Sequence, residues 1–378
     1  MLSEKYLRQL YKRFLRFHKS SFLLDAKKHS TSLEELELTD KIIGQFFNNY
    51  VKPSFFSFLV SMKIIIYSQE TVYEFIMKTS SEDWKLWPYL KFLETEKIIK
   101  VKRNGKVSLL KKDILSLIPK PQSEQEIKTK IEKKLRLKVK GKEPVIGLFK
   151  KFQDFQVKAK WDQMPISQDS AIFVARKILE NIPLNKKFLF VGDDDFVSVV
   201  LGIADPGIES LVIDADEQLL GCIDILAKKF NLKIKTRKVD IRKTKTLGER
   251  FVGFLANPIY TEPGVREFVG YGVNQLGKDG GLVFLEVGDE DIGNRFLFLQ
   301  DFFNKSNLKI EELISGKIFY PYIELYKEDK EILRRLSRMM NKKIIESSPK
   351  LAASLYVFTY LPSRPQKVKF KKPIYAYI

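Results

Sequence analysis

The chain has 378 residues, 44% of them hydrophobic, which is enough to build the cores of two domains. One cysteine and two histidines exclude a disulfide framework and a Cys/His metal centre. No apolar run approaches the roughly 18 residues of a membrane span, and no signal peptide is evident, so we expect a cytoplasmic protein. A charged fraction of 30% with so little Cys and His is compatible with a thermophilic source.

The net charge of +20 is distributed unevenly. Residues 1–150 hold 31 of the 67 Lys and Arg residues but only 17 of the 47 Asp and Glu residues. A basic first part is compatible with a nucleic-acid partner. It is equally compatible with a lysine-rich, solvated surface, so nucleic acid is a possible partner and not a predicted one.

Residues 1–118 predict a helical, winged-helix-like domain. Helical spacing occurs over residues 6–17, 41–50, 70–78 and 84–96, and residues 64–67 form a short β-rich run. Two further β-rich runs flank Asn104-Gly105, the strongest short hairpin signal. Such modules often bind DNA. Here the helix in the recognition position carries Glu82, Asp83, Glu94 and Glu96, which phosphate disfavours, so we expect a packing or dimerisation domain and a homodimer.

Residues 119–160 read as a basic linker. Pro119 and Pro121 are followed by a lysine-rich, helix-like run and then by Gly141 and Pro144. We interpret the charge run over residues 133–142 as a solvated face.

Residues 161–362 predict an α/β domain with a methyltransferase-like Rossmann sheet. Apolar runs of strand length alternate with helical segments, at residues 188–191, 211–213, 234–239, 251–256 and 281–287. Two more β-rich runs, residues 313–326 and 351–361, are expected to close the sheet as an antiparallel pair. Between them, residues 327–348 are expected to be helical, and residues 363–378 are predicted to be a flexible basic tail.

Three acids follow the first of these strands. The apolar run ends at Gly192, where the backbone can turn sharply, and Asp193, Asp194 and Asp195 come next. Turns that bind phosphate are rich in glycine and avoid carboxylates, so this turn suits a cation better than a pyrophosphate. The alternative is that the acids cap the following helix and face solvent.

The next strands also end in acids, at the edge where open α/β sheets bind ligands. Asp214 suits the two hydroxyls of a ribose, and Asp240 suits an adenine amino group, whereas Asp216 is expected to cap a helix. A nucleoside with a positive charge and no phosphate fits this set. A sulfonium nucleoside, S-adenosylmethionine or its decarboxylated form, meets that description. No metal or prosthetic group is expected.

The fourth strand ends in Asn257-Pro258-Ile259-Tyr260. A related pattern, Asp/Asn/Ser-Pro-Pro-aromatic, marks enzymes that alkylate an amine nitrogen. In them the side chain and the next carbonyl groups accept hydrogen bonds from the amine, and the aromatic ring packs on it. The alternative is an ordinary Asn-Pro turn after a strand.

Together these motifs resemble the branched-chain polyamine synthases of thermophiles. The resemblance rests on Gly192-Asp193-Asp194-Asp195, on residues 211–217 and on residues 257–264. It implies a winged-helix-like domain joined to a methyltransferase-like Rossmann domain. It also implies transfer of aminopropyl groups from decarboxylated S-adenosylmethionine, the co-substrate, to the internal nitrogen of spermidine.

The resemblance also implies residue roles. Asp195 would be the catalytic acid that deprotonates or orients the amine, together with Asn257 and Tyr260. Gly192, Asp193, Asp214 and Asp240 would hold the nucleoside, with Asp193 at its cationic aminopropyl end. Substrate-binding residues on the amine side would be Asp162, Asp194 and Pro258.

One departure from the family pattern, Asp-Pro-Pro-Tyr, leaves the activity open. Asn257 removes a negative charge that would attract a polycation, and Ile259 removes a rigid proline. The chain could be a synthase with an altered amine preference or a paralogue with reduced activity. Two rival functions remain: a methyltransferase that uses S-adenosylmethionine on an amine, possibly of nucleic acid, and a non-catalytic winged-helix DNA-binding protein that senses polyamines.

Overall fold

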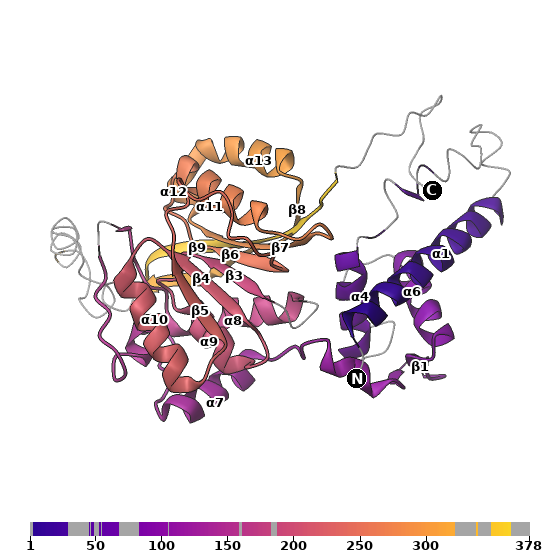
Figure 1. The fold of residues 1–378 in the computed structure, drawn as a ribbon, viewed down its shortest axis with the longest axis horizontal. Coiled ribbons are helices and arrows are strands. Elements are labelled where there is room, and N and C mark those ends of the chain that lie inside the picture. Colours follow the sequence, from indigo (N-terminus) through magenta and orange to yellow (C-terminus); the bar gives the residue numbers. More distant parts are fainter. Residues whose placement is uncertain are drawn as a thin grey trace. The chain divides into compact units, whose positions relative to one another are not determined.

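The structure, a computed structural model, describes residues 3–28, 45, 47–48, 53, 55–67, 83–104, 106–158, 161–182, 187–321, 338 and 349–363. The chain forms two compact units, one mainly of residues 1–118 and one of residues 119–362. In the part that the structure describes, the first is helical apart from one hairpin, and the second is built on a large sheet (Figure 1).

The first unit packs around a cluster of aromatic rings. Its elements are α1 (Glu4–Lys28), α4 (Phe55–Tyr67), α6 (Asp83–Thr95), β1 (Ile99–Val101), β2 (Val107–Leu109) and the 3-10 helix η2 (Lys112–Ser116). The ring centroid of Phe14 in α1 lies 4.9 Å from that of Phe58 in α4 and 4.4 Å from that of Tyr89 in α6. Each of the three helices therefore contributes at least one ring to the same core.

Within this unit the structure confirms the hairpin and changes one element. β1 and β2 pair antiparallel, with Val101 opposite Val107. Residues 64–67, predicted as a β-rich run, are instead the last turn of α4. The buried hydrophobic residues of α4 recur every three or four positions: Phe55, Phe58, Leu59, Met62, Ile65 and Ile66. Packing on one face of the helix thus overrides the β-propensity of isoleucine.

The assignment of a winged helix to this unit stays a prediction. The hairpin follows the helices in the expected order. The helix predicted over residues 70–78 lies outside the described residues, and the one over residues 41–50 lies largely outside them.

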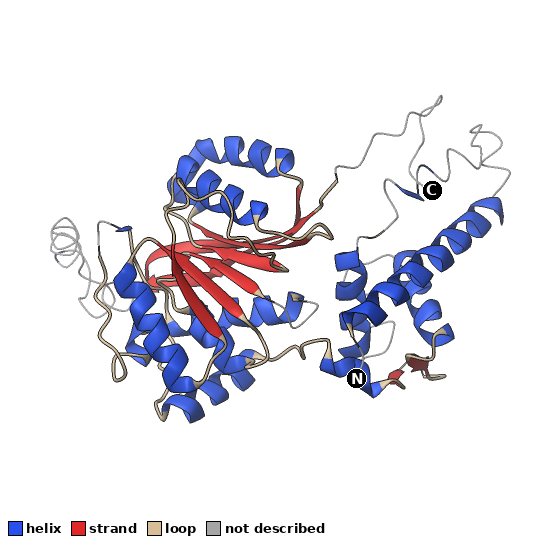
Figure 2. Ribbon diagram, viewed as in Figure 1, coloured by secondary structure: helices blue, strands red, loops and turns tan. Residues whose placement is uncertain are grey.

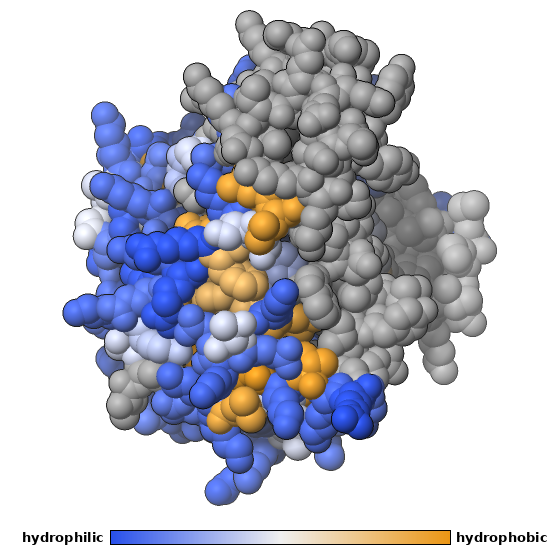
Figure 3. Space-filling model, turned by 90° about the vertical axis from the view of Figure 1, so that its right-hand side faces the viewer, coloured by the Kyte–Doolittle hydropathy of each residue, from blue (hydrophilic) through white to orange (hydrophobic). Residues whose placement is uncertain are grey.

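Hydrophobic residues gather on part of the face drawn in Figure 3. They form a band near the middle of that view, with mainly hydrophilic residues on one side of it. No helix in the described part of the chain combines the length and the apolar composition needed to cross a lipid bilayer.

The second unit begins earlier than the sequence indicated. Residues 119–160, predicted as a linker, contain α7 (Glu124–Leu135) and the 3-10 helix η3 (Val145–Leu148). A capping box starts α7, because Ser123 accepts from the backbone N–H of Glu126 and Glu126 accepts from that of Ser123. Its buried residues, Ile127, Ile131 and Leu135, recur every four positions on one face, and polar and charged residues, four lysines among them, occupy the rest. The helix-like run predicted here is therefore confirmed, as an amphipathic helix that packs with the second unit.

A seven-stranded sheet forms the centre of the second unit (Figure 2). Its strands are β3 (Phe188–Val191), β4 (Ser210–Asp214), β5 (Ile234–Lys238), β6 (Gly253–Ala256), β7 (Gly281–Val287), β8 (Leu308–Pro321) and β9 (Pro349–Tyr360). They lie in the order β5-β4-β3-β6-β7-β9-β8. The first five are parallel, and β9 is antiparallel to both its neighbours, as predicted for the closing pair. The order of the first five is that of a Rossmann sheet, with its switch point between β3 and β6.

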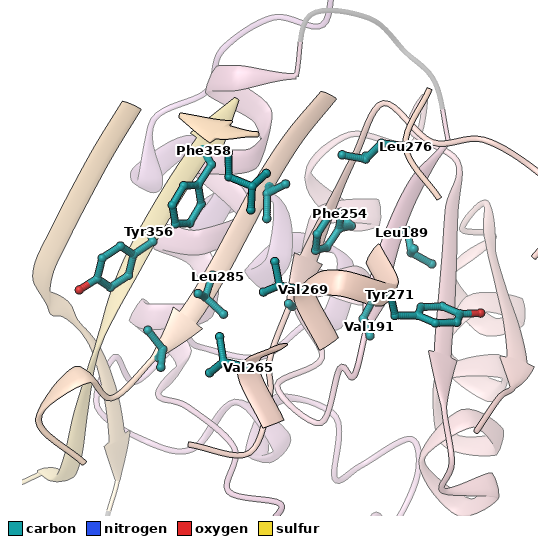
Figure 4. Packing of buried hydrophobic residues seen from close by; sticks show 14 of the residues in the cluster. Leu189, Val191, Phe254, Val265, Val269, Tyr271, Leu276, Leu285, Tyr356 and Phe358 are labelled. Atoms are coloured by element: carbon teal, nitrogen blue, oxygen red, sulfur yellow. The ribbon is translucent and has the colours of Figure 1, made fainter. Parts of the chain in front are cut away.

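Helices cover both faces of this sheet. One face carries α8 (Gln168–Asn181), α9 (Val197–Ala204) and α10 (Glu217–Phe230), and the other carries α11 (Glu262–Asn274) and α13 (Phe296–Lys305) (Figure 1). The short helix α12 (Asp289–Ile292) and the 3-10 helix η5 (Gly293–Arg295) lead into α13. Between the sheet and the helices α11 and α13, apolar side chains from both layers pack together, such as Val265 and Val269 of α11 and Phe358 of β9 (Figure 4). Burial on both faces explains the nearly continuous apolar runs of the strands.

Gly272 of α11 allows the helix to approach β6 closely. A Cβ atom there would overlap the ring of Phe254, whereas a Cβ on Gly270, two residues earlier, would meet its nearest neighbour at 3.8 Å. We expect Gly272→Ala to lower the free energy of unfolding by about 1–3 kcal/mol through overpacking. Gly270→Ala, the matched control, should be neutral or stabilising by up to about 1 kcal/mol. Urea denaturation measures both; equal effects would contradict this account of the packing.

Candidate active site

A cavity of about 490 Å³ opens at the carboxyl ends of β3, β4, β5 and β6. Of the ten residues predicted for the site, eight line it: Asp162, Gly192, Asp194, Asp214, Asp240, Asn257, Pro258 and Tyr260. Asp193 and Asp195 do not, and both are only 1% exposed. The sequence pattern therefore predicted where the cavity lies, but the three consecutive acids differ in their burial and in their neighbours.

A second hollow, of about 560 Å³, lies between the start of α7 and the end of α9. Lys130 and Gln122 at its wall donate to the carbonyl oxygen of Ala204, the last residue of α9. These contacts cap a helix C-terminus, so we assign this hollow a structural role.

The turn after β3 has a strained backbone. Gly192 has φ +78°, and a Cβ there would lie 3.0 Å from the carbonyl oxygen of Asn257. Phe196, at the end of the turn, has φ +50°, which is unusual for a bulky residue. Its buried ring is fixed between Phe149 and Phe155, at centroid distances of 5.5 and 5.4 Å. Aromatic packing therefore holds the acids in place.

Asp193 serves the fold. Both its oxygens lie 3.3 Å from the backbone nitrogen of Ser198 in the first turn of α9, which donates to them. Burial raises the pKa of Asp193 well above its usual range. The sequence predicted that this acid holds the cationic end of the nucleoside, but the structure turns its side chain toward the helix, away from the cavity.

Asp194 is the acid of this turn that reaches the cavity. Its Oδ2 accepts from the backbone N–H of Met164 at 2.9 Å, and its Oδ1 accepts from Asn257 Nδ2 at 3.0 Å. Burial, and next the charge of Asp214, raise the pKa of Asp194 to about 7. A carboxyl group with such a pKa can exchange a proton near neutral pH.

Asp195 lies behind Asn257 and contacts a carboxyl group that the sequence reading missed. Its oxygens accept from the backbone N–H of Ile166 at 2.6 Å and from Asn257 Nδ2 at 2.8 Å. Its third neighbour is Glu286 of β7, which is fully buried and finds no N–H or O–H donor among the described residues. Burial raises the pKa of Asp195 well above its usual range and that of Glu286 to about 7. Two carboxyl groups this close and this buried favour a form in which at least one of them is protonated.

Asp214 is oriented by the start of α10. Its Oδ1 accepts from the backbone N–H of Asp216 at 2.7 Å, and burial raises its pKa to about 6. Asp216 caps α10, as predicted, through the N–H of Gln218. Asp216 also accepts from Lys158 Nζ at 2.7 Å and from Gln163 Nε2 at 3.0 Å, which ties both residues to the end of β4.

Asp240 lies at the outer edge of the cavity and is paired. Arg242 donates to its two oxygens from Nε and Nη2, both at 3.0 Å. These bonds lower the pKa of Asp240 to about 2. To accept from an adenine amino group, the carboxylate of Asp240 would have to give up or share its hydrogen bonds with Arg242. The sequence pattern did not predict this neighbour.

Two tyrosines close the other end of the cavity. The hydroxyl groups of Tyr260 and Tyr320 lie 2.5 Å apart, and burial raises the pKa of both well above the usual range. Ile259 lies at the surface of the cavity and is 44% exposed. The described residues contain no group of three or more His, Cys, Asp and Glu side chains arranged to hold a metal ion.

Comparison with known families matches residues 151–369 to the branched-chain polyamine synthase A C-terminal domain, more than half of the chain. The chain belongs to the branched-chain polyamine synthase family. This confirms the resemblance given by the acidic turn and the Asn-Pro motif.

Two curated relatives come from Methanocaldococcus jannaschii. The chain is 29% identical over 269 residues to an uncharacterized protein, covering 67% of this chain and 66% of that protein. It is 32% identical over 95 residues to an N(4)-bis(aminopropyl)spermidine synthase, covering 24% of this chain and 27% of that protein. The chain therefore spans less than two thirds of the length of each.

Among solved structures, the chain is similar to the branched-chain polyamine synthase of Thermus thermophilus in complex with N4-aminopropylspermidine and 5'-methylthioadenosine. The sequence identity is 16% and the TM-score 0.45, over 88% of this chain and 95% of that one. The chain is also similar to the structure of a putative RNA methyltransferase of Pyrococcus horikoshii. The sequence identity is 15% and the TM-score 0.41, over 57% of this chain and 96% of that one.

The raised pKa of Asp214 leads to a prediction for nucleoside binding. An ionised carboxylate accepts two ribose hydroxyl groups better than a protonated one, so affinity for 5'-methylthioadenosine should be constant well above pH 6 and fall below it. The fall should approach about tenfold per pH unit. Calorimetric titrations from about pH 5 to 8 measure it. Asp214→Asn should bind more weakly with a flatter profile; a flat wild-type profile would remove Asp214 from the nucleoside site.

Proposed function

We propose that this chain is an aminopropyltransferase. It would move aminopropyl groups from decarboxylated S-adenosylmethionine to the internal nitrogen of a polyamine such as spermidine, giving branched polyamines. The observation that carries the proposal is that one cavity holds Asp214, suited to ribose hydroxyls, beside Asp194, whose pKa lies near neutrality. Family membership supports it, as does the product named for the second curated relative.

In this proposal the nucleoside lies over the ends of β3, β4 and β5. Gly192 leaves room for the sugar, Asp214 accepts its hydroxyl groups, and Asp240 with Arg242 flanks the base. The apolar side chains of Ile213, Val239 and Ile241 line the same end and suit a purine ring. The sulfonium then points toward Asp194 and Asn257.

The chemical step needs one lone pair and one proton acceptor. The polyamine nitrogen attacks the methylene carbon bound to sulfur, the carbon–sulfur bond breaks, and its electron pair stays on sulfur, giving neutral 5'-methylthioadenosine. The internal nitrogen carries a proton in solution at neutral pH, so it would first give that proton to Asp194, the acid that reaches the cavity, which frees the lone pair. After the attack, the tertiary ammonium carries the positive charge that left sulfur. The step balances without a metal ion, and the alignment of the two substrates supplies much of the rate enhancement.

The remaining residues would position the amine. Asn257 fixes Asp194, and Pro258 and Tyr260 line the same cavity. Asp162 lies exposed at the rim, where an outer ammonium group of the polyamine could pair with it. Asp195 and Glu286 lie one layer deeper and would act through Asn257.

The product decides between this proposal and its methyltransferase rival. With spermidine and decarboxylated S-adenosylmethionine, we expect mass spectrometry to show spermidine enlarged by one or two aminopropyl groups, together with 5'-methylthioadenosine. S-adenosylmethionine should give no transfer, because its carboxylate would lie beside Asp194. Methylated spermidine, or no product with either nucleoside, would overturn the proposal.

The placement of Asp194 and Asp195 predicts unequal effects of neutralising them. Asp194→Asn should lower kcat by about 100-fold or more, because the proton acceptor is lost, while 5'-methylthioadenosine affinity stays within severalfold. Asp195→Asn should lower kcat less, since that carboxyl lies behind Asn257. Thermal unfolding checks that both variants fold. The reverse order would return the catalytic role to Asp195, as the sequence predicted.

For the first unit we propose a winged-helix-like module that supports a homodimer. The β1–β2 hairpin, which follows the described helices α1, α4 and α6, supports the first point. Light scattering of the full chain measures the oligomeric state.

A further inference from the structure

The side-chain amide of Asn257 lies between two carboxyl groups, in a position that would suit an ammonium group of a substrate. Its nitrogen lies 3.0 Å from an oxygen of Asp194 and 2.8 Å from an oxygen of Asp195, so one uncharged NH₂ group gives a hydrogen to each of two carboxyls. A nitrogen between two carboxylate oxygens is also the geometry of a bound alkylammonium.

The other oxygens of these two acids are supplied by neutral donors too. The backbone N–H of Met164 serves Asp194, and that of Ile166 serves Asp195. Glu286 has no such donor among the described residues and contacts Asp195. Protons and amides, and not a lysine or arginine, therefore balance the charge of this cluster.

Few fixed charges act on the cluster from its surroundings. Asp214 and Asp162 are the further acids that interact with Asp194, and the hydroxyl groups of Tyr260 and Tyr320 lie near Asp195 and Glu286. The cation that lines the cavity in the described part of the chain, Arg242, is paired with Asp240 at the far end.

We propose that Asn257 is a specificity-determining residue that makes the site insensitive to the total charge of its acceptor amine. With its carboxyls already bridged by a neutral donor, the cluster gains little from further ammonium groups on the same molecule. The site would therefore use acceptors of low charge, such as triamines, about as well as tetraamines. This inference rests on the aminopropyl transfer proposed above.

Replacing Asn257 by Asp tests the inference. The change removes the bridging donor and adds a carboxyl, so the cluster should then favour acceptors with more ammonium groups. We expect the ratio of kcat/KM for spermine to that for spermidine to rise about tenfold relative to the wild type. Raising the ionic strength should reduce that gain, because the added attraction acts between charges.

Two further variants separate charge from structure. Asn257→Ala removes the bridge without adding charge, so it should shift the ratio in the same direction but less. Asn274→Asp adds the same charge at the exposed end of α11, about 20 Å of helix from the start of that element, and should leave the ratio within about twofold. Calorimetric titration of spermine and spermidine into the protein saturated with 5'-methylthioadenosine gives the same comparison without turnover.

The outcomes are distinct. A wild type that transfers no aminopropyl group to any polyamine overturns the proposed function. A wild type that is active, with Asn257→Asp lowering kcat/KM equally for both acceptors, makes Asn257 a structural residue and overturns the specificity inference. A wild type that already prefers spermine strongly also overturns it.

Discussion

The carboxyl groups of Asp195 and Glu286 are buried, that of Asp194 lies beside them at the cavity, and the site depends on how their charge is balanced. Three ionised carboxylates so close together and so poorly hydrated would repel one another strongly. Bound protons and neutral N–H donors remove most of that repulsion. The donors belong to residues 164–166 and to the turn after β6, so the charge balance exists only when both segments have folded against the end of β3.

The parallel sheet brings these segments together. β3 is hydrogen-bonded to β4 on one side and to β6 on the other, so their carboxyl ends, with Asp214 and Asn257, meet at one edge. Glu286 enters from β7, which pairs with β6. The helices cover the two faces and leave that edge as the place where polar groups can gather (Figure 1).

Part of this architecture was readable in the sequence. Strands buried on both faces appear as apolar runs, so β3 to β7 and the residues after them could be located, including Asp194, Asp214 and Asn257. The directions in which the acids point could not be predicted, because they depend on contacts with residues distant in the sequence. Asp193 turns to α9, Asp195 lies behind Asn257, and Phe196, at the end of the acidic turn, is held by two other rings. Glu286 was hidden because it lies inside an apolar strand, where a single acid carries no spacing signal.

The residues around α7, which precede the first strand of the sheet, limit where this chain can be divided and recombined. Gln122 and Lys130 cap α9, and Phe149 and Phe155 pin Phe196 at the strained end of the acidic turn. Residues 119–158 therefore belong with the sheet domain and support its candidate site. Exchange of the upstream unit between homologues, by evolution or by an engineer, would keep these supports with a junction near residue 119 and would lose them with a junction near residue 161.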